Sequence, residues 1–211
     1  LRVGKEDVVE RTAAALPYGL TAGQREGRDI LRQDLRGAFV SQRLIQGDVG
    51  SGKTVVAFLA MLDAVSQGYQ AAIMAPTEVL ARQHAQTFGQ MLEEYGLPYE
   101  VVCLVGSMTA REKRMAREKI AGEDGLFVVG THALIQDAVD FRQLALVITD
   151  EQHRFGVRQR ETLTKKGASC PHTAVMSATP IPRTLAMILY SNMRISLIRE
   201  LPANRLPIKT C

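Results

Sequence analysis

One glycine-rich segment constrains most strongly what this chain of 211 residues can fold into. It reads Gly47-Asp48-Val49-Gly50-Ser51-Gly52-Lys53-Thr54. The segment fits the pattern G-x-x-x-x-G-K-[ST], in which the glycines let the backbone bend around a phosphate so that successive N–H groups point inward. A helix that begins near Lys53 adds the positive end of its dipole at the same point. We therefore expect an ATP-binding loop, with Lys53 on the β- and γ-phosphates and the Thr54 hydroxyl on Mg²⁺.

The residues on either side of this loop indicate a strand before it and a helix after it. Leu44 and Ile45 end a short apolar strand. Behind the loop, apolar residues recur at helical spacing until Gly68, and they are Val55, Phe58, Leu59, Leu62 and Val65. A glycine-rich surface turn is the alternative interpretation. The lysine and threonine in register, together with the strand and helix flanks, favour the phosphate loop.

Composition limits the class of protein more than it identifies it. With 46% hydrophobic and 23% charged residues, the chain is long enough for one well-buried domain. No apolar run approaches the roughly 20 residues of a membrane span. A net charge of +4 and a pI near 9.1 are compatible with a nucleic-acid partner, but many enzymes are equally basic.

The ends and the cysteines suggest the cellular context. The first ten residues contain acidic side chains and therefore do not resemble a signal peptide, and the missing initiator methionine suggests a piece of a longer protein. Cys103, Cys170 and Cys211 have no metal-binding spacing. This pattern favours free or buried thiols in a reducing cytoplasm, so we expect a cytoplasmic protein without a membrane segment.

Strand and helix patterns alternate along the chain and predict an α/β fold. Helices are expected over 5–16 and 21–35, after Thr77, and after Ser107 or Thr109, with further helical segments between the later strands. Besides the strand before the loop, strands are expected over 70–75, 99–105, 126–129, 145–149, 173–176 and 194–198. Such alternation implies right-handed crossovers and a mostly parallel sheet with helices on both faces. Ligands of such sheets bind beyond the carboxyl ends of the strands.

A second motif stands at the end of the strand predicted over 144–149. Its two acids, Asp150 and Glu151, are costly to place side by side unless cations or hydrogen bonds compensate their charge. A phosphate-bound Mg²⁺ would compensate it, with Asp150 and Thr54 holding the metal and Glu151 deprotonating the attacking water. Asp-Glu pairs alone are a weak signal, since most are solvated turns. Together with the upstream loop, the pair predicts a nucleotide hydrolase.

The acids continue into a longer stretch that resembles a known family. Asp150-Glu151-Gln152-His153 is similar to motif II of superfamily 2 helicases, and DEQHRFGV is similar to the RecG family of bacterial ATP-dependent DNA helicases. Other stretches agree in order and spacing: LIQGDVGSGKT, MAPTEVLARQH, VVGTHALIQD and MSATPIPRTLA. The resemblance extends from about Leu16 to Pro207. Translocases of the Mfd family, which act on stalled RNA polymerase, also resemble the chain, but Gln152 and Ser51 favour RecG.

The resemblance implies the first RecA-like lobe of a motor that uses ATP and Mg²⁺ to move on double-stranded DNA. Such motors remodel stalled replication forks and recombination intermediates. Residues 1–20 would form an N-terminal helix and linker, 21–200 the lobe with motifs I, Ia, Ib, II and III, and 201–211 a linker. A second RecA-like lobe and a wedge domain that grips branched DNA are expected outside this chain. By itself, the chain is therefore expected to bind ATP weakly and to hydrolyse it very slowly.

The resemblance also implies roles for individual residues. Gln24 matches the glutamine that reads the adenine edge, although by residue type alone it is more often an ordinary helix glutamine. Lys53, Asp150, Glu151 and His153 would be catalytic. Contacts to the DNA backbone are implied at loop-to-helix junctions, at Pro76, Thr77, Arg82, Gly106, Ser107, Gly130, Thr131 and His132. Thr77 also fits a plain helix cap.

Coupling between the ATP and DNA sites is implied for Gln152, His153, Ser177, Ala178 and Thr179. The last three resemble motif III, and the alternative interpretation is a strand-ending turn. His84 and His172 have no functional role in this interpretation. A third possibility is a nucleotide-gated binding module that does not hydrolyse ATP. Glu151 argues against it, because a pure switch has no need of a general base.

Overall fold

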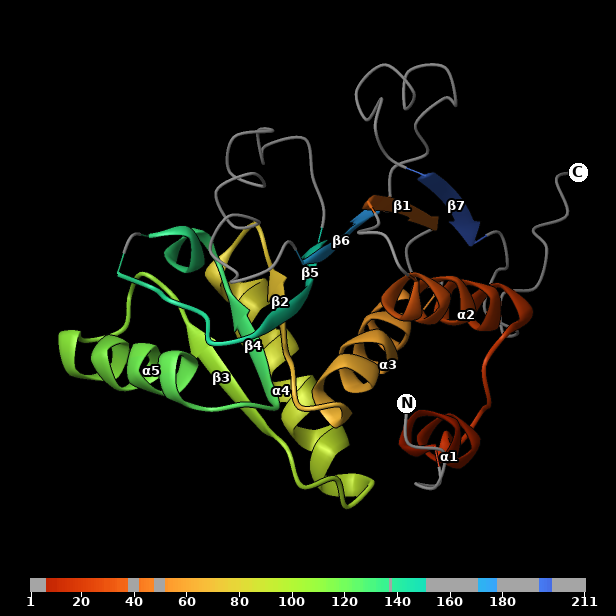
Figure 1. Cartoon of the computed structure of the whole chain (residues 1–211), viewed down its shortest axis with the longest axis horizontal. Helices are drawn as coiled ribbons and strands as arrows, with labels where there is room; N and C mark the ends of the chain where they lie inside the picture. Colours follow the sequence, from red (N-terminus) through yellow and green to blue (C-terminus); the bar gives the residue numbers. More distant parts are fainter. Residues whose placement is uncertain are drawn as a thin grey trace, which may run out of the picture.

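The computed structural model describes residues 7–37, 42–47, 52–136, 138–150, 171–177 and 194–198. Their strands form one parallel seven-stranded sheet in the order β3-β4-β2-β5-β6-β1-β7 (Figure 1). The strands are β1 (Gln42–Gly47), β2 (Gln70–Met74), β3 (Glu100–Leu104), β4 (Leu126–Gly130), β5 (Leu144–Asp150), β6 (His172–Ser177) and β7 (Arg194–Ile198). The predicted α/β fold with a parallel sheet is confirmed.

The helices begin where the sequence places good capping residues. They are α1 (Val8–Ala15), α2 (Ala22–Arg36), α3 (Lys53–Ser66), α4 (Glu78–Glu94) and α5 (Ala110–Gly122). The hydroxyls of Thr21, Thr77 and Thr109 each accept a hydrogen bond from an N–H group in the first turn. Of the two starts considered for α5, Thr109 is the N-cap, because Glu112 completes a capping box with it.

One predicted helical segment is much shorter than the others. Between β4 and β5 the described chain forms only the 3₁₀ turn η1 (His132–Ile135), which follows Thr131. Four residues close a single turn, which the i→i+3 bond from the Leu134 N–H to the Thr131 carbonyl stabilises. The segments predicted between β5 and β6 and over 201–211 lie outside the described residues.

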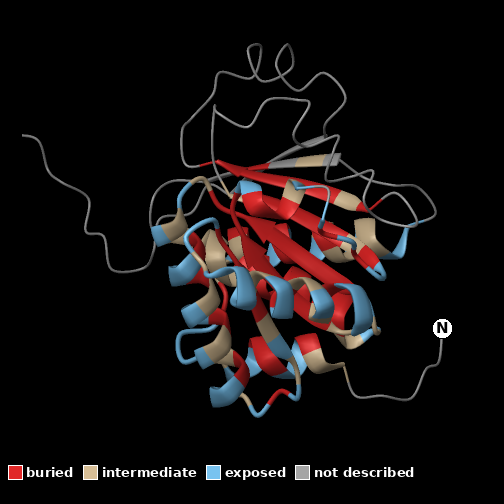
Figure 2. Cartoon of the chain, turned by 90° about the vertical axis from the view of Figure 1, so that its left-hand side faces the viewer, coloured by how far each residue is buried: buried red, intermediate tan, exposed pale blue. Residues whose placement is uncertain are grey.

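Helices cover both faces of the sheet, so the central strands are buried on both sides. Alternate residues of β2 show the two faces: Ala71 and Ile73 pack into a core with α1 to α4, whereas Ala72 and Met74 pack into a second core with α5 and η1. Figure 2 shows the buried strands between helices whose outer surfaces are exposed. No described helix is both long and apolar enough to cross a membrane.

The first core surrounds α3, the helix that follows the glycine-rich loop. Its residues from Val56 to Val65 are all buried. Phe58 stacks on Phe127 of β4 with ring centroids 5.5 Å apart, and Phe88 of α4 lies 5.6 Å from Phe58. Packing on every side holds α3, and with it the start of the helix at Lys53, in one position relative to the sheet.

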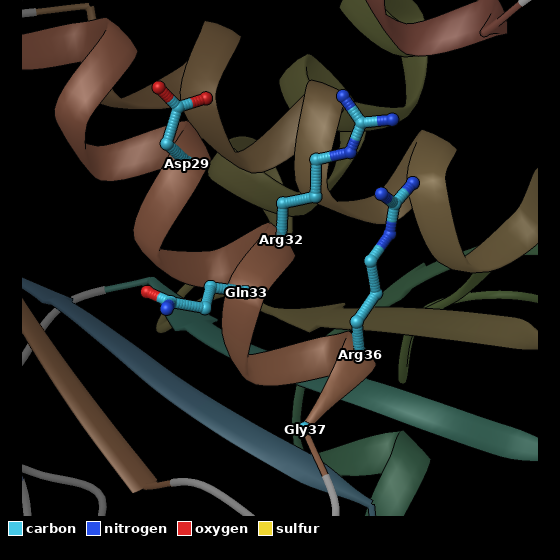
Figure 3. A pocket seen from close by; sticks show the side chains of 5 residues that line it. All are labelled: Asp29, Arg32, Gln33, Arg36 and Gly37. Atoms are coloured by element: carbon cyan, nitrogen blue, oxygen red, sulfur yellow. The ribbon is translucent and has the colours of Figure 1, made fainter.

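Charged residues join α1 and α2 to α3. Arg32 of α2 forms ion pairs with Asp7 and Glu10 at the start of α1, and its Nε lies 3.7 Å from Oδ2 of the buried Asp63 of α3. Arg36 lies 3.7 Å from the same carboxylate. Figure 3 shows Arg32 and Arg36 extending side by side from α2 at a pocket that Asp29, Gln33 and Gly37 also line.

The Asp63 carboxyl gives a pH-dependent prediction. Burial raises its pKa above the ordinary 3.8, against the opposing effect of Arg32 and Arg36. The folded chain therefore holds this proton at higher pH than the unfolded chain, and ionisation of Asp63 lowers the free energy of unfolding as pH rises from 3.8 through the raised pKa. We expect Asp63→Asn, which keeps an acceptor for the Gln67 amide, to become more stable than wild type over that window.

Urea denaturation of both proteins between about pH 3.5 and 7 measures this difference. Asp124→Asn is the control, because Asp124 forms a half-exposed ion pair with Arg142. A stability of Asp63→Asn that falls relative to wild type as pH rises would contradict the prediction.

Candidate functional site

The segments singled out in the sequence all leave the sheet at its carboxyl edge. Asp150 at the end of β5 is in register with Met176 of β6, which is in register with Ile45 of β1. The ends of these three neighbouring strands are therefore level. Adjacent strands lie about 4.8 Å apart, which places the backbones of Asp150 and of β1 about 10 Å from each other. The start of the glycine-rich loop and Asp150 thus lie at one edge, with only β6 between them.

The end of the glycine-rich loop has the backbone that a phosphate loop needs. Gly52 has φ +76°, in the left-handed region that glycine adopts without strain. Its carbonyl accepts from the Val55 and Val56 N–H groups as α3 begins. Lys53 and Thr54 form the first turn, where helical N–H groups point outward and the dipole favours an anion. This geometry is compatible with the predicted phosphate contacts.

Gln24 lies directly against this loop. A Cβ placed on Gly52 would be 1.8 Å from Gln24 Nε2, so a larger residue there would displace the amide. The Gln24 Oε1 accepts from the Thr21 N–H at 2.9 Å and completes the capping box of α2. The structure thus gives Gln24 a structural role and also places its amide beside the loop; contact with adenine remains a prediction.

Several predicted site residues lie outside the described residues. They are Asp48, Val49, Gly50 and Ser51 in the loop, Glu151, Gln152 and His153 after β5, and Ala178 and Thr179 after β6. The roles predicted for them stay predictions. Ser177, the first residue of the predicted motif III, is buried at the end of β6 in register with Gln46 of β1.

His84, to which the sequence interpretation assigns no role, contacts the predicted metal ligand Asp150. It lies on α4 with 8% of its surface exposed, and its Nε2–H donates to Asp150 Oδ2 at 2.5 Å. Its ring stacks on Phe88, with centroids 5.8 Å apart. The available signal was its spacing: His84 follows Ala81 and precedes Phe88 on the sheet-facing stripe of α4, where a histidine requires a polar partner.

The junctions after β2 and β4 meet at the same edge. The Ala75 N–H donates to the Gly130 carbonyl at 2.8 Å, which joins the junction that leads to Thr77 to the junction that leads to Thr131. Thr77 is exposed and caps α4, accepting from the Leu80 N–H at 3.3 Å. A cap leaves other N–H groups of the first turn for an anion, so the cap and a phosphate contact are compatible.

At the junction after β3, the donors that a phosphate would need are already bound to a carboxylate. The Ser107 N–H donates to Glu78 Oε1 at 2.9 Å, and its hydroxyl donates to Oε2 at 2.5 Å. Arg82 donates to the same hydroxyl oxygen at 3.3 Å. The hydroxyl and N–H of Ser107 lower the pKa of the Glu78 carboxyl, which stays ionised. A phosphate could use these donors of Ser107 only after the carboxylate moves.

The available donors fit Mg²⁺. Among the described residues, no three histidine, cysteine, aspartate or glutamate side chains gather as a metal-binding group. Mg²⁺ that binds together with ATP takes one or two protein oxygens and completes its shell with phosphates and water. The Asp150 carboxylate and the Thr54 hydroxyl are oxygen donors of this kind.

Comparisons with known proteins agree with this geometry. A family model described as DEAD/DEAH box helicase matches residues 14–188. The chain is 49% identical over 206 residues to "ATP-dependent DNA helicase RecG" of Mycobacterium tuberculosis, covering 92% of the chain and 28% of that protein. It is 50% identical over 207 residues to the protein of the same name from Pasteurella multocida, covering 97% and 30%. The chain therefore spans less than a third of these relatives.

Solved structures give the same result. The structure of RecG bound to a three-way DNA junction matches with a TM-score of 0.81 and 39% identity, over 97% of this chain and 27% of that one. The DEAD-box helicase Mss116 bound to single-stranded RNA matches with a TM-score of 0.70 and 19% identity, over 94% and 44%. At that identity, the second match supports the fold alone.

Proposed function

Because this chain belongs to the DEAD/DEAH box helicase family, we propose that it is the ATP-binding motor lobe of a RecG-type DNA helicase. One observation supports this most strongly: β1, which leads into the glycine-rich loop, and β5, which ends at Asp150, finish level at one sheet edge with β6 between them. The two halves of a nucleotide site, far apart in the chain, thus face the same region.

The residues at this edge have the chemistry for phosphoryl transfer to water. Lys53 and the N–H groups at the start of α3 bind phosphate oxygens, and Thr54 and Asp150 would hold Mg²⁺. When bound, the metal neutralises charge that develops on the phosphates. Glu151 orients and deprotonates the water, and Gln24 binds the adenine edge. These groups act by positioning and electrostatics, as this reaction requires.

The other half of the same edge would bind DNA. The junctions at Thr77 and at Gly130-Thr131-His132 present helix starts and hydroxyls, which bind backbone phosphates without reading sequence. The solved RecG relative is bound to a three-way junction, so we propose branched and duplex DNA as the partner. Coupling between the two halves would involve Ser177 to Thr179 together with Gln152 and His153.

We further propose that this lobe acts within a longer bacterial protein of the cytoplasm. A second RecA-like lobe would complete the ATP cleft, and a wedge domain would grip branched DNA. Hydrolysis would move the protein on double-stranded DNA and remodel stalled forks and recombination intermediates. Since residues from a second lobe contribute to hydrolysis in related NTPases, the lobe alone would turn over ATP very slowly.

The test measures phosphate release by the full-length protein with and without a three-way DNA junction. We expect the junction to stimulate hydrolysis, and Glu151→Gln to lower the stimulated rate by about 10²–10⁴-fold, because a general base contributes that much. Binding of an ATP analogue should persist in this variant.

Glu118→Gln is the matched control, since Glu118 is an exposed residue of α5. An ATP hydrolysis rate that the DNA junction does not raise would refute the motor function. So would a wild-type hydrolysis rate in Glu151→Gln.

A further inference from the structure

We propose that His84 is a positioning residue that couples DNA binding at the start of α4 to the nucleotide site through Asp150. The proposal rests on the function proposed above and adds a route between the two sites that does not involve motif III. It is based on a side chain that has no role in the sequence interpretation and on one short hydrogen bond.

The position of His84 fits such a link. It is one of the described α4 residues that are buried, and its Nε2 lies 2.5 Å from Asp150 Oδ2. The Asp150 side chain itself is 19% exposed at the open edge of the sheet, so it is not a core carboxylate that needs a buried partner. Stacking on Phe88 limits rotation of the imidazole and keeps the N–H directed at the carboxylate.

Helix α4 connects this bond to the DNA side. Thr77, the predicted phosphate contact, caps α4, and His84 follows seven residues later, about 10 Å along the axis at 1.5 Å per residue. The helix is continuous over its 17 residues. A shift of its first turn when phosphates bind is therefore passed on to His84, because an unbroken helix moves largely as one body.

At the other end, the bond determines how Asp150 presents its oxygens. Oδ2 accepts from His84, which leaves Oδ1 and the remaining lone pairs for a metal or its water. Hydrogen bonds of this kind orient metal-binding carboxylates, and their loss typically lowers metal affinity or activity 10–100-fold. The position of α4 would thus set how well Asp150 binds Mg²⁺ with ATP, and the effect is reciprocal by thermodynamic linkage.

The experiment measures the dissociation constant of a fluorescent ATP analogue with Mg²⁺, using the full-length protein with and without a three-way DNA junction. The ratio of the two constants is the coupling, which typically amounts to about 5–150-fold. We expect His84→Leu, which fills the space without a donor, to reduce this ratio to about one. His84→Gln, which can donate to Asp150, should keep the ratio within about threefold of wild type.

His172→Leu is the matched control, because His172 is a half-buried histidine at the amino end of β6. This end lies away from the carboxyl edge of the sheet, where Asp150 is. It should keep the coupling ratio of wild type. Thermal unfolding of each variant accompanies the binding measurements.

The possible results distinguish failure of the His84 proposal from failure of the proposed function. A wild-type coupling ratio in His84→Leu would overturn the proposal. So would an equal loss in His84→Gln and His84→Leu accompanied by an equal fall in melting temperature, since this indicates packing alone. If the wild-type protein itself shows no DNA-dependent change in nucleotide affinity or hydrolysis, the proposed function fails before any variant is compared.

Discussion

Replacing Lys53 by alanine is expected to lower ATP hydrolysis by the full-length protein about 10²–10³-fold and to stop unwinding of branched DNA. Lys53 is the first residue of α3, where the helix dipole and the outward N–H groups already favour a phosphate. Alanine keeps the helix and removes the positive charge from the first turn of α3. The loss is therefore in stabilisation of the transition state and not in folding.

DNA affinity should change little in this variant. The junctions proposed to bind DNA follow β2 and β4, and β5 and β6 separate these strands from β1 in the sheet. Phosphate release, strand displacement from a three-way junction and fluorescence anisotropy with labelled DNA measure the three quantities.

Lys119→Ala is the control, because it removes the same charge from a lysine that pairs with Glu100 at the amino end of β3. Unwinding by Lys53→Ala at the wild-type rate would show that the glycine-rich loop does not bind the reacting phosphates.

Replacing Gly130 by alanine is expected to lower the free energy of unfolding by about 1–3 kcal/mol, as overpacking of a filled interior does. A Cβ at this position would lie 2.4 Å from the Leu104 carbonyl oxygen and 2.8 Å from Leu134 Cγ. The first atom belongs to the backbone of β3, which pairs with β4 at this residue. A paired strand cannot move away from the added Cβ without losing hydrogen bonds, so relieving the clash lowers the stability of the fold.

Urea denaturation measures the change, and the DNA affinity of the full-length protein should fall with it, since Gly130 begins the junction at Gly130-Thr131-His132 that is proposed to bind DNA. Gly89→Ala is the matched control: Gly89 lies within α4 with nothing inside 4 Å of its added Cβ. Alanine there is expected to stabilise the protein by about 0.5–1 kcal/mol. Wild-type stability of Gly130→Ala would contradict the packing at the β3–β4 edge.

Local patterns predicted much of the fold. The threonine before each of α2 and α4 marks the helix start because its hydroxyl serves the first turn whatever packs outside it. The expected 70–75 and 126–129 segments correspond to β2 and β4, since buried parallel strands appear as continuous apolar runs. The strand order could not be predicted this way, because β1 pairs with β6 and β7 from the far end of the chain.

The candidate site likewise has one part that could be predicted from the sequence and another that only the tertiary structure shows. The glycines, the helix start and the lysine of the predicted phosphate loop are neighbours in the segment from Gly47 to Thr54. This part of the site could therefore be predicted from the sequence by itself. Tertiary structure alone decided that His84 bonds Asp150, 66 residues away, and that Glu78 occupies the donors of Ser107. A side chain has many possible partners in an unfolded chain. Only the packing of α4 against the sheet selects one.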